Sequence, residues 1–125
     1  ITVRSIVGNF LEHARIFYFY SGGNEEVFMG SADWMPRNLD RRVEILFPVL
    51  DDTLKEKVKH ILDVELADNT KAHVLKPDGE YEKIDRRGKV LVNSQKQFCE
   101  EAVAAVPKTD HVYRERVFVP AEPAE

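Results

Sequence analysis

The stretch HARIFYFYSGGNEEVFMGSAD, residues 13–33, predicts a β-hairpin and decides the fold. Residues 16–20 are all apolar or aromatic side chains that favour strands, and such an unbroken run predicts a strand covered on both faces. Residues 21–24 supply a turn, and residues 26–31 run back as the partner strand. Gly30 in that partner marks a point where backbone or a ligand comes close. We therefore expect a sheet built around this hairpin.

The rest of the chain alternates helical and extended patterns. Apolar residues at helical spacing predict helices over residues 2–13, 51–68 and 94–105. Their expected caps are Thr2, the Asp51–Asp52 pair and Ser94. Extended patterns predict further strands over residues 43–49, 71–76 and 81–84. These elements predict an α/β (α+β) fold, a mixed sheet flanked by helices.

Composition sets the domain organisation. A chain of 125 residues with 43% hydrophobic side chains can bury one core, so we expect one domain over residues 1–106 and a C-terminal tail over residues 107–125. With 22 acidic and 18 basic side chains the net charge is −4, and neither half is basic, which argues against nucleic-acid binding. The longest apolar run, residues 16–20, is too short to span a membrane. The single Cys99 favours a reducing compartment and is expected to be a buried apolar group.

The start of the chain predicts an N-terminally truncated domain. The chain opens on Ile1 rather than methionine, close to the start of a predicted helix, which indicates a piece excised from a longer protein. The first strands of the sheet are then missing and an edge is exposed. Because an open edge pairs readily with another chain, we expect self-association into a homo-oligomer.

His13 and Arg15 have the most informative spacing. Side chains two apart on a strand point to the same face, so an imidazole and a guanidinium would share one pocket. An imidazole can act as nucleophile or proton carrier toward phosphorus, while the cation holds the nonbridging oxygens. The alternative is a histidine that caps the helix beside it, with Arg15 as a surface cation.

Ser31 and Asp33 end the returning strand and would lie alongside His13. A hydroxyl there can hydrogen-bond phosphate or the ring, and a carboxylate can fix the imidazole tautomer and stabilise its cation. The alternative is an ordinary strand end with a bulge. Because the four groups can converge, we predict His13, Arg15, Ser31 and Asp33 as catalytic residues of a phosphate site.

The histidine, the basic residue two positions on, and Gly-Ser-Ala-Asp after one hairpin resemble a half-site of the phospholipase D superfamily. Arg15 replaces the usual lysine, Asp33 the usual asparagine, and Tyr20 stands at the place of the motif aspartate. Two segments carry a more specific resemblance, FLEHAR at residues 10–15 and SADWMPRNLDRRVE at residues 31–44. They resemble the last domain of bacterial polyphosphate kinase of the large, histidine-phosphorylating type, and the likeness becomes loose after about residue 105.

This resemblance implies a phospholipase D-like fold and reversible transfer of the terminal phosphate of ATP to polyphosphate. It implies a phosphohistidine on a preceding domain absent here, so His13 is expected to contact nucleotide phosphate rather than accept the phosphoryl group. It implies ATP or ADP and magnesium as cofactors, with the magnesium ligands on the missing part of the parent chain. Expected partners are ATP, polyphosphate and the preceding domains. The expected location is the cytoplasm, with the parent enzyme peripheral to the inner membrane, and the fragment alone should be inactive.

The basic clusters supply further phosphate contacts. With His13, we predict Arg37, Asn38 and Arg41 as nucleotide-binding residues. Arg41 and Arg42 would leave an extended chain on opposite faces, so one of them is expected to pair with Asp40 or Glu44. The turn Arg86-Arg87-Gly88-Lys89 is either part of a polyanion path or a solvated loop.

The other conspicuous side chains are expected to be structural. Trp34 either walls the pocket or packs under it, and core packing is the favoured alternative. His60, His73 and His111 lack a second ligand at metal spacing, so no metal site is predicted.

Two other functions compete with the kinase reading. One is a phospholipase D-like phosphodiesterase that completes its site by dimerisation, which Lys at position 15 and Asn at position 33 would have favoured. The other is a noncatalytic docking domain that keeps the fold without the chemistry.

Overall fold

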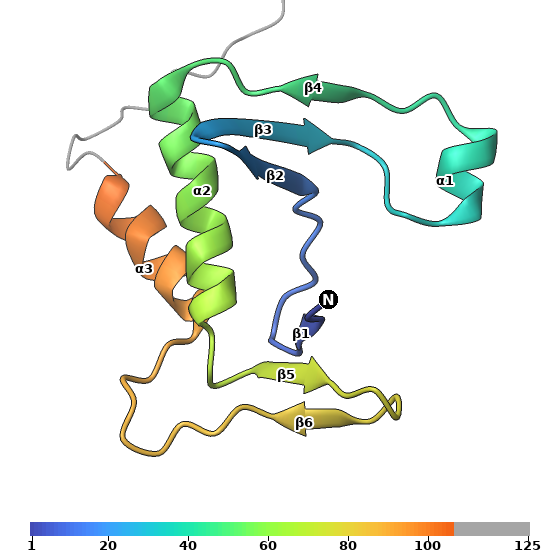
Figure 1. Cartoon of the computed structure of the whole chain (residues 1–125). Coiled ribbons are helices and arrows are strands. Elements are labelled where there is room, and N and C mark those ends of the chain that lie inside the picture. Colours follow the sequence, from blue (N-terminus) through green and yellow to red (C-terminus); the bar gives the residue numbers. More distant parts are fainter. Residues whose placement is uncertain (107–125) are drawn as a thin grey trace, which may run out of the picture.

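The computed structural model describes residues 1–106, so the predicted tail and His111 lie outside the described residues. The elements, in chain order, are β1 (Arg4–Ile6), β2 (Ile16–Ser21), β3 (Asn24–Gly30), α1 (Pro36–Arg41), β4 (Leu46–Pro48), α2 (Asp52–Ala67), β5 (Ala72–Leu75), β6 (Tyr81–Lys83) and α3 (Ser94–Ala105) (Figure 1). The mixed helix and strand class is therefore confirmed. No helix within residues 1–106 is long and apolar enough to cross a membrane.

The strands divide between two antiparallel sheets rather than forming one mixed sheet. One sheet has the order β2-β3-β4 and the other the order β1-β5-β6. They lie at opposite ends of α2, which connects β4 to β5 (Figure 1). The prediction of a single sheet was wrong because strand patterns show which segments are extended but not which segments pair.

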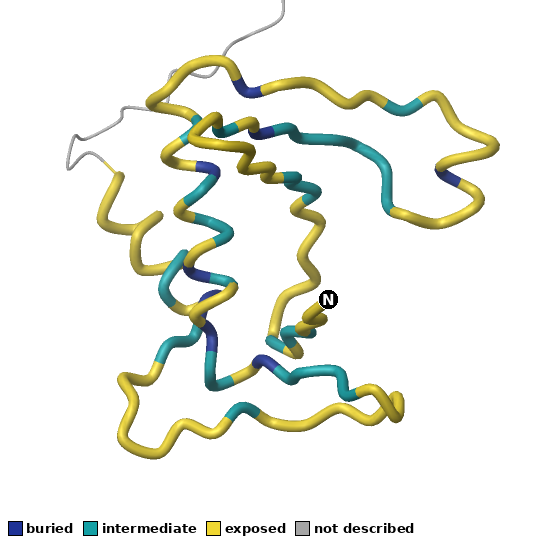
Figure 2. The backbone as a smooth tube through the Cα atoms, in the orientation of Figure 1, coloured by how far each residue is buried: buried dark blue, intermediate teal, exposed yellow. Residues whose placement is uncertain are grey.

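The predicted hairpin is confirmed as β2 and β3, which pair from Ile16 opposite Met29 to Ser21 opposite Asn24. One face of this sheet packs against α2, where Val27 and Val49 meet Val58 (Figure 2). Burial of these valines provides the hydrophobic stabilisation that holds the sheet on the helix.

The opposite face of the hairpin is not covered, in contrast to the prediction. Phe19, on the face away from Val27, is 55% exposed. The helix predicted over residues 2–13 would have covered this face, but that helix does not form. Gly30 does meet a close neighbour, because a side chain there would lie 3.4 Å from the carbonyl oxygen of Ile45.

The N-terminal segment is extended where a helix was predicted. Its β1 strand pairs with β5, and the Val7 N–H donates to the carbonyl of Lys71 at 3.1 Å. The Gln95 side chain then takes the place of helical partners: its Oε1 accepts from the N–H groups of Asn9 and Phe10, and its Nε2 donates to the Phe10 carbonyl at 2.8 Å. A side chain on Gly8 would lie 2.1 Å from Gln95 Oε1, so this approach requires glycine.

Helix α2 matches its prediction closely. The Asp51 carboxylate accepts from the Leu54 N–H at 2.9 Å, which is the predicted N-terminal cap. Helix α3 also forms as predicted, but Asn93 caps it by accepting from the Lys96 N–H, and Ser94 is buried instead. Cys99 on α3 is exposed, so its predicted burial was wrong.

Asp68 joins three elements immediately after α2. Its side chain is fully buried and accepts five hydrogen bonds. Oδ1 accepts from the N–H groups of Thr70, Lys71 and Ala72, and Oδ2 accepts from the N–H and the hydroxyl of Ser94. Burial raises the pKa of Asp68, but the hydrogen bonds outweigh it and hold the pKa below its ordinary value. The ionised carboxylate therefore holds β5 and α3 at the end of α2.

Replacing Asp68 with asparagine is expected to lower the free energy of unfolding by about 2 kcal/mol, because the new amide cannot accept from Ser94 and leaves buried donors unpaired. Since folding lowers the pKa of Asp68, its contribution is complete above its unfolded value of about 4 and is lost as the pH falls through the folded value. Urea unfolding at several pH values measures both effects. The exposed Asp63→Asn on α2 is the matched control, and equal losses in the two variants would contradict this role.

Candidate functional site

Arg15 is the centre of the predicted site. It lies directly before β2, and its carbonyl accepts from the Gly30 N–H at 3.0 Å, which holds Arg15 beside the end of β3. Its Nε donates to Asp33 Oδ1 at 2.8 Å, and its Nη2 lies 2.7 Å from the same oxygen. Its Nη2 also lies 3.1 Å from His13 Nδ1. The structure therefore brings together three of the four predicted catalytic residues.

The contact with Arg15 determines what His13 can do. A guanidinium only donates hydrogen bonds, so His13 Nδ1 must accept. The proton of a neutral imidazole is then on Nε2. Within the described residues Nε2 has no hydrogen-bond partner, and His13 is exposed. The ring thus presents an N–H donor to solvent, which suits an incoming phosphate oxygen.

Asp33 is held from two directions. The hydrogen bond from Arg15 lowers the pKa of Asp33, and the charges of Arg15, His13 and Arg37 add smaller effects of the same sign. Its backbone carbonyl accepts from the Met35 N–H at 2.7 Å and from Asn38 Nδ2 at 3.3 Å. Asp33 orients the guanidinium rather than the imidazole, which differs from the tautomer-fixing role expected from sequence.

Ser31 has other hydrogen-bond partners. Its hydroxyl donates to a Glu44 carboxylate oxygen and accepts from the Ile45 N–H at 3.0 Å. These bonds tie the end of β3 to the segment that enters β4. In this structure Ser31 therefore positions the backbone next to Asp33.

The arginines predicted to bind nucleotide extend from α1, a helix that was not predicted. Pro36 at its first turn is a favourable start, and this signal was available in the sequence. Arg37 and Arg41 are exposed, whereas Asn38 is only 2% exposed. Within residues 1–106 neither Arg41 nor Arg42 pairs with Asp40 or Glu44. That predicted pair was wrong because residues 36–41 are helical and Glu44 instead accepts from Ser31.

Trp34 follows Asp33 directly and forms an aromatic pair next to the site. Its ring stacks on Phe17 with centroids 5.8 Å apart, but Trp34 is 78% exposed, so its predicted core packing was wrong. A groove of about 360 Å³ runs beside this pair over Phe19, Phe28 and Leu46. The His13, Arg15 and Asp33 cluster is thus flanked by an apolar surface.

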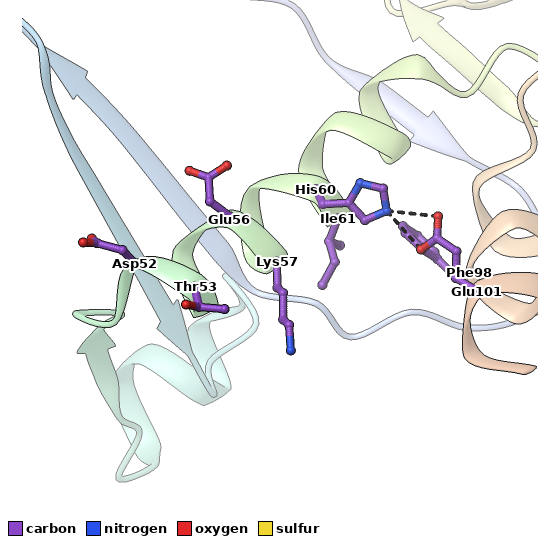
Figure 3. A pocket seen from close by; sticks show the side chains of 8 residues that line it. All are labelled: Asp52, Thr53, Glu56, Lys57, His60, Ile61, Phe98 and Glu101. Carbon is purple, nitrogen blue, oxygen red and sulfur yellow. Dashed lines mark hydrogen bonds and ion pairs between the residues drawn. The ribbon is translucent and has the colours of Figure 1, made fainter. Parts of the chain in front are cut away.

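A larger hollow of about 810 Å³ lies between α2 and α3, away from the predicted site (Figure 3). His60 Nε2 lies 3.0 Å from both carboxylate oxygens of Glu101 there. Hydrogen bonds from Gln97 and then His60 lower the pKa of Glu101. This pair joins the two helices, and within residues 1–106 no three His, Cys, Asp or Glu side chains gather to hold a metal ion.

Comparison with known proteins decides the family. The family model described as "Polyphosphate kinase C-terminal domain 2" matches residues 1–95. This chain belongs to the polyphosphate kinase family. The matched range includes His13, Arg15 and Asp33.

Relatives in the polyphosphate kinase family are much longer than this chain. A polyphosphate kinase of Prosthecochloris aestuarii is 53% identical over 103 residues, which cover 82% of this chain and 14% of that protein. One from Pseudomonas aeruginosa is 49% identical over 107 residues, covering 85% of this chain and 16% of that protein. The crystal structure of polyphosphate kinase from Porphyromonas gingivalis matches with a TM-score of 0.75 and 38% identity, covering 82% of this chain and 16% of that one. The chain therefore corresponds to a small part of each relative.

The ion pair at the centre of the site can be tested by carboxyl NMR titration. We expect Asp33 to titrate below the ordinary range, and Arg15→Gln to raise its pKa because the largest stabilising hydrogen bond is lost. Asp85, whose pKa is lowered in the same way by Arg87, should not respond to Arg15→Gln. An ordinary pKa for Asp33 in the unaltered chain would contradict the observed geometry.

Proposed function

We propose that this chain is the C-terminal catalytic part of a polyphosphate kinase that reversibly transfers the terminal phosphate of ATP to polyphosphate. The observation that carries this proposal is the Arg15 guanidinium bound to both His13 and Asp33. Family membership supports the reaction class. The transferred phosphate would pass through a phosphohistidine on a preceding domain of the parent chain.

His13 acts on the moving phosphoryl group in this proposal. Phosphoryl transfer needs positioning and charge neutralisation more than covalent chemistry from the protein. The His13 Nε2–H donates a hydrogen bond, or its proton, to a phosphate oxygen, while the charge of Arg15 offsets the negative charge that builds up on the oxygens. Since Asp33 and Gly30 hold Arg15, its guanidinium needs little reorganisation when the phosphate arrives.

The remaining predicted residues divide into contact and positioning roles. Arg37 and Arg41 are exposed cations that bind the phosphates of ATP or ADP. Asn38 and Ser31 act indirectly, because Asn38 holds the Asp33 backbone and Ser31 holds the β3 to β4 connection. Magnesium would be bound by groups on the rest of the parent chain and would shield phosphate charge during transfer.

In this proposal the parent enzyme supplies the phosphoacceptor histidine that the reaction needs. Its preceding domains carry the phosphoacceptor, so the chain alone lacks kinase activity. We place the enzyme in the cytoplasm, peripheral to the inner membrane, and expect it to be a homo-oligomer. The phospholipase D-like fold remains part of this proposal.

The role of His13 is tested in the intact enzyme. We expect His13→Ala to reduce polyphosphate synthesis from ATP roughly 100-fold, the usual range for a lost acid or base group, and to reduce ATP synthesis from polyphosphate and ADP by a similar factor. His60→Ala, which removes an exposed histidine on α2, is the matched control and should retain activity. The measurements are the polyphosphate formed from ATP and, in reverse, the ATP formed from polyphosphate and ADP.

Two outcomes would contradict the kinase proposal. Full activity of His13→Ala would favour a noncatalytic docking domain. Turnover of a chromogenic phosphodiester by the 125-residue chain, abolished by His13→Ala, would favour the phosphodiesterase instead.

A further inference from the structure

A second basic hollow lies on the other sheet, where the loop after β6 folds back against the connection from α2 to β5. Its volume is about 380 Å³, and its lining includes Asn69, Thr70, Lys83, Arg86 and Arg87. The Arg15 site lies on the β2-β3-β4 sheet, so this hollow belongs to a different part of the molecule.

Hydrogen bonds fix the walls of this hollow. Asn69 Nδ2 donates to the Val90 carbonyl at 2.7 Å, and Asn69 Oδ1 accepts from the Val92 N–H at 2.9 Å. At the other end of the loop, Lys83 pairs with His73 in the sheet. The Lys89 N–H donates to the Arg86 carbonyl at 3.1 Å and closes the turn between them. The loop that carries the arginines is therefore held at both ends.

Two basic side chains that line the hollow have no acidic partner within residues 1–106. Asp85 is the acidic residue in its lining, and Arg87 neutralises it through a pair 2.8 Å long. Within residues 1–106, Lys83 and Arg86 form no ion pair. Two unpaired cations in the lining of one hollow favour an anion with several acceptor oxygens.

We propose that this hollow is a second phosphate-binding site, in which Lys83 and Arg86 bind a segment of a condensed phosphate chain. The inference rests on the proposed function, because a polymeric substrate can engage two separate sites on one protein. Binding at the second site raises the effective concentration of the polymer at the first without any new contact there. The same chemistry would accept the triphosphate of a nucleotide, so the test separates the two sources.

The test measures binding of end-labelled inorganic polyphosphate to the 125-residue chain by fluorescence anisotropy. The double variant Lys83→Gln/Arg86→Gln should weaken binding about tenfold through loss of two charged contacts. The matched control Lys55→Gln/Lys57→Gln on α2 changes the net charge equally and should alter binding less than about twofold. Unlabelled tripolyphosphate and ATP are then added as competitors. Displacement by either supports the site, and the stronger competitor identifies the source of the phosphate.

Three results would overturn the second site. These are no binding of labelled polyphosphate, unchanged binding in Lys83→Gln/Arg86→Gln, or an equal loss in the α2 control pair, which would indicate only net charge. The last two results leave the proposed kinase function untouched, because that function is tested by His13→Ala in the intact enzyme. The absence of any binding would count against the Arg15 site as well. Conversely, an active His13→Ala enzyme would leave the binding measured here unaffected.

Discussion

The buried Asp68 carboxylate is the interaction on which the rest of the structure depends. It accepts from the start of β5 and from Ser94 at the start of α3. Ser94 precedes Gln95, whose amide holds the backbone of Asn9 and Phe10. That backbone leads three residues later to His13. A carboxylate at the end of one helix therefore sets where the functional segment begins, through two further hydrogen-bonding side chains.

The site follows the same principle of fixing a charged group by several contacts. Arg15 is positioned by its own backbone in the β2 to β3 ladder and by the Asp33 carboxylate, and it then fixes the acceptor nitrogen of His13. Asp33 is in turn held through its carbonyl by the buried Asn38. Arg15, which would face phosphate, is thus supported by Asp33, which would not. Such preorganisation is what phosphoryl transfer requires of a protein.

Local patterns predicted the elements whose stability is local. The β2 to β3 hairpin has its turn residues and strand formers in sequence order, and α2 has its own cap in Asp51. The helix predicted over residues 2–13 does not form, because hydrogen bonds to distant partners in β5 and to Gln95 hold this segment extended despite its helical spacing. Gly8 in that segment, a poor helix residue, was the signal that could have warned of this. The grouping of His13, Arg15 and Asp33 was predictable from strand geometry, whereas the buried partners of Asp68 and the preference of Ser31 for Glu44 depend on contacts between distant segments.

The central claim is that Arg15 donates to His13 Nδ1, so that the His13 Nε2–H is presented to phosphate. Nitrogen-15 NMR of the histidine rings measures this most directly, since it distinguishes the two tautomers. We expect the neutral form of the His13 ring to carry its proton on Nε2, and the Nε2 resonance to move when tripolyphosphate is added. A His13 ring protonated on Nδ1, or one whose resonances ignore tripolyphosphate, would contradict the account.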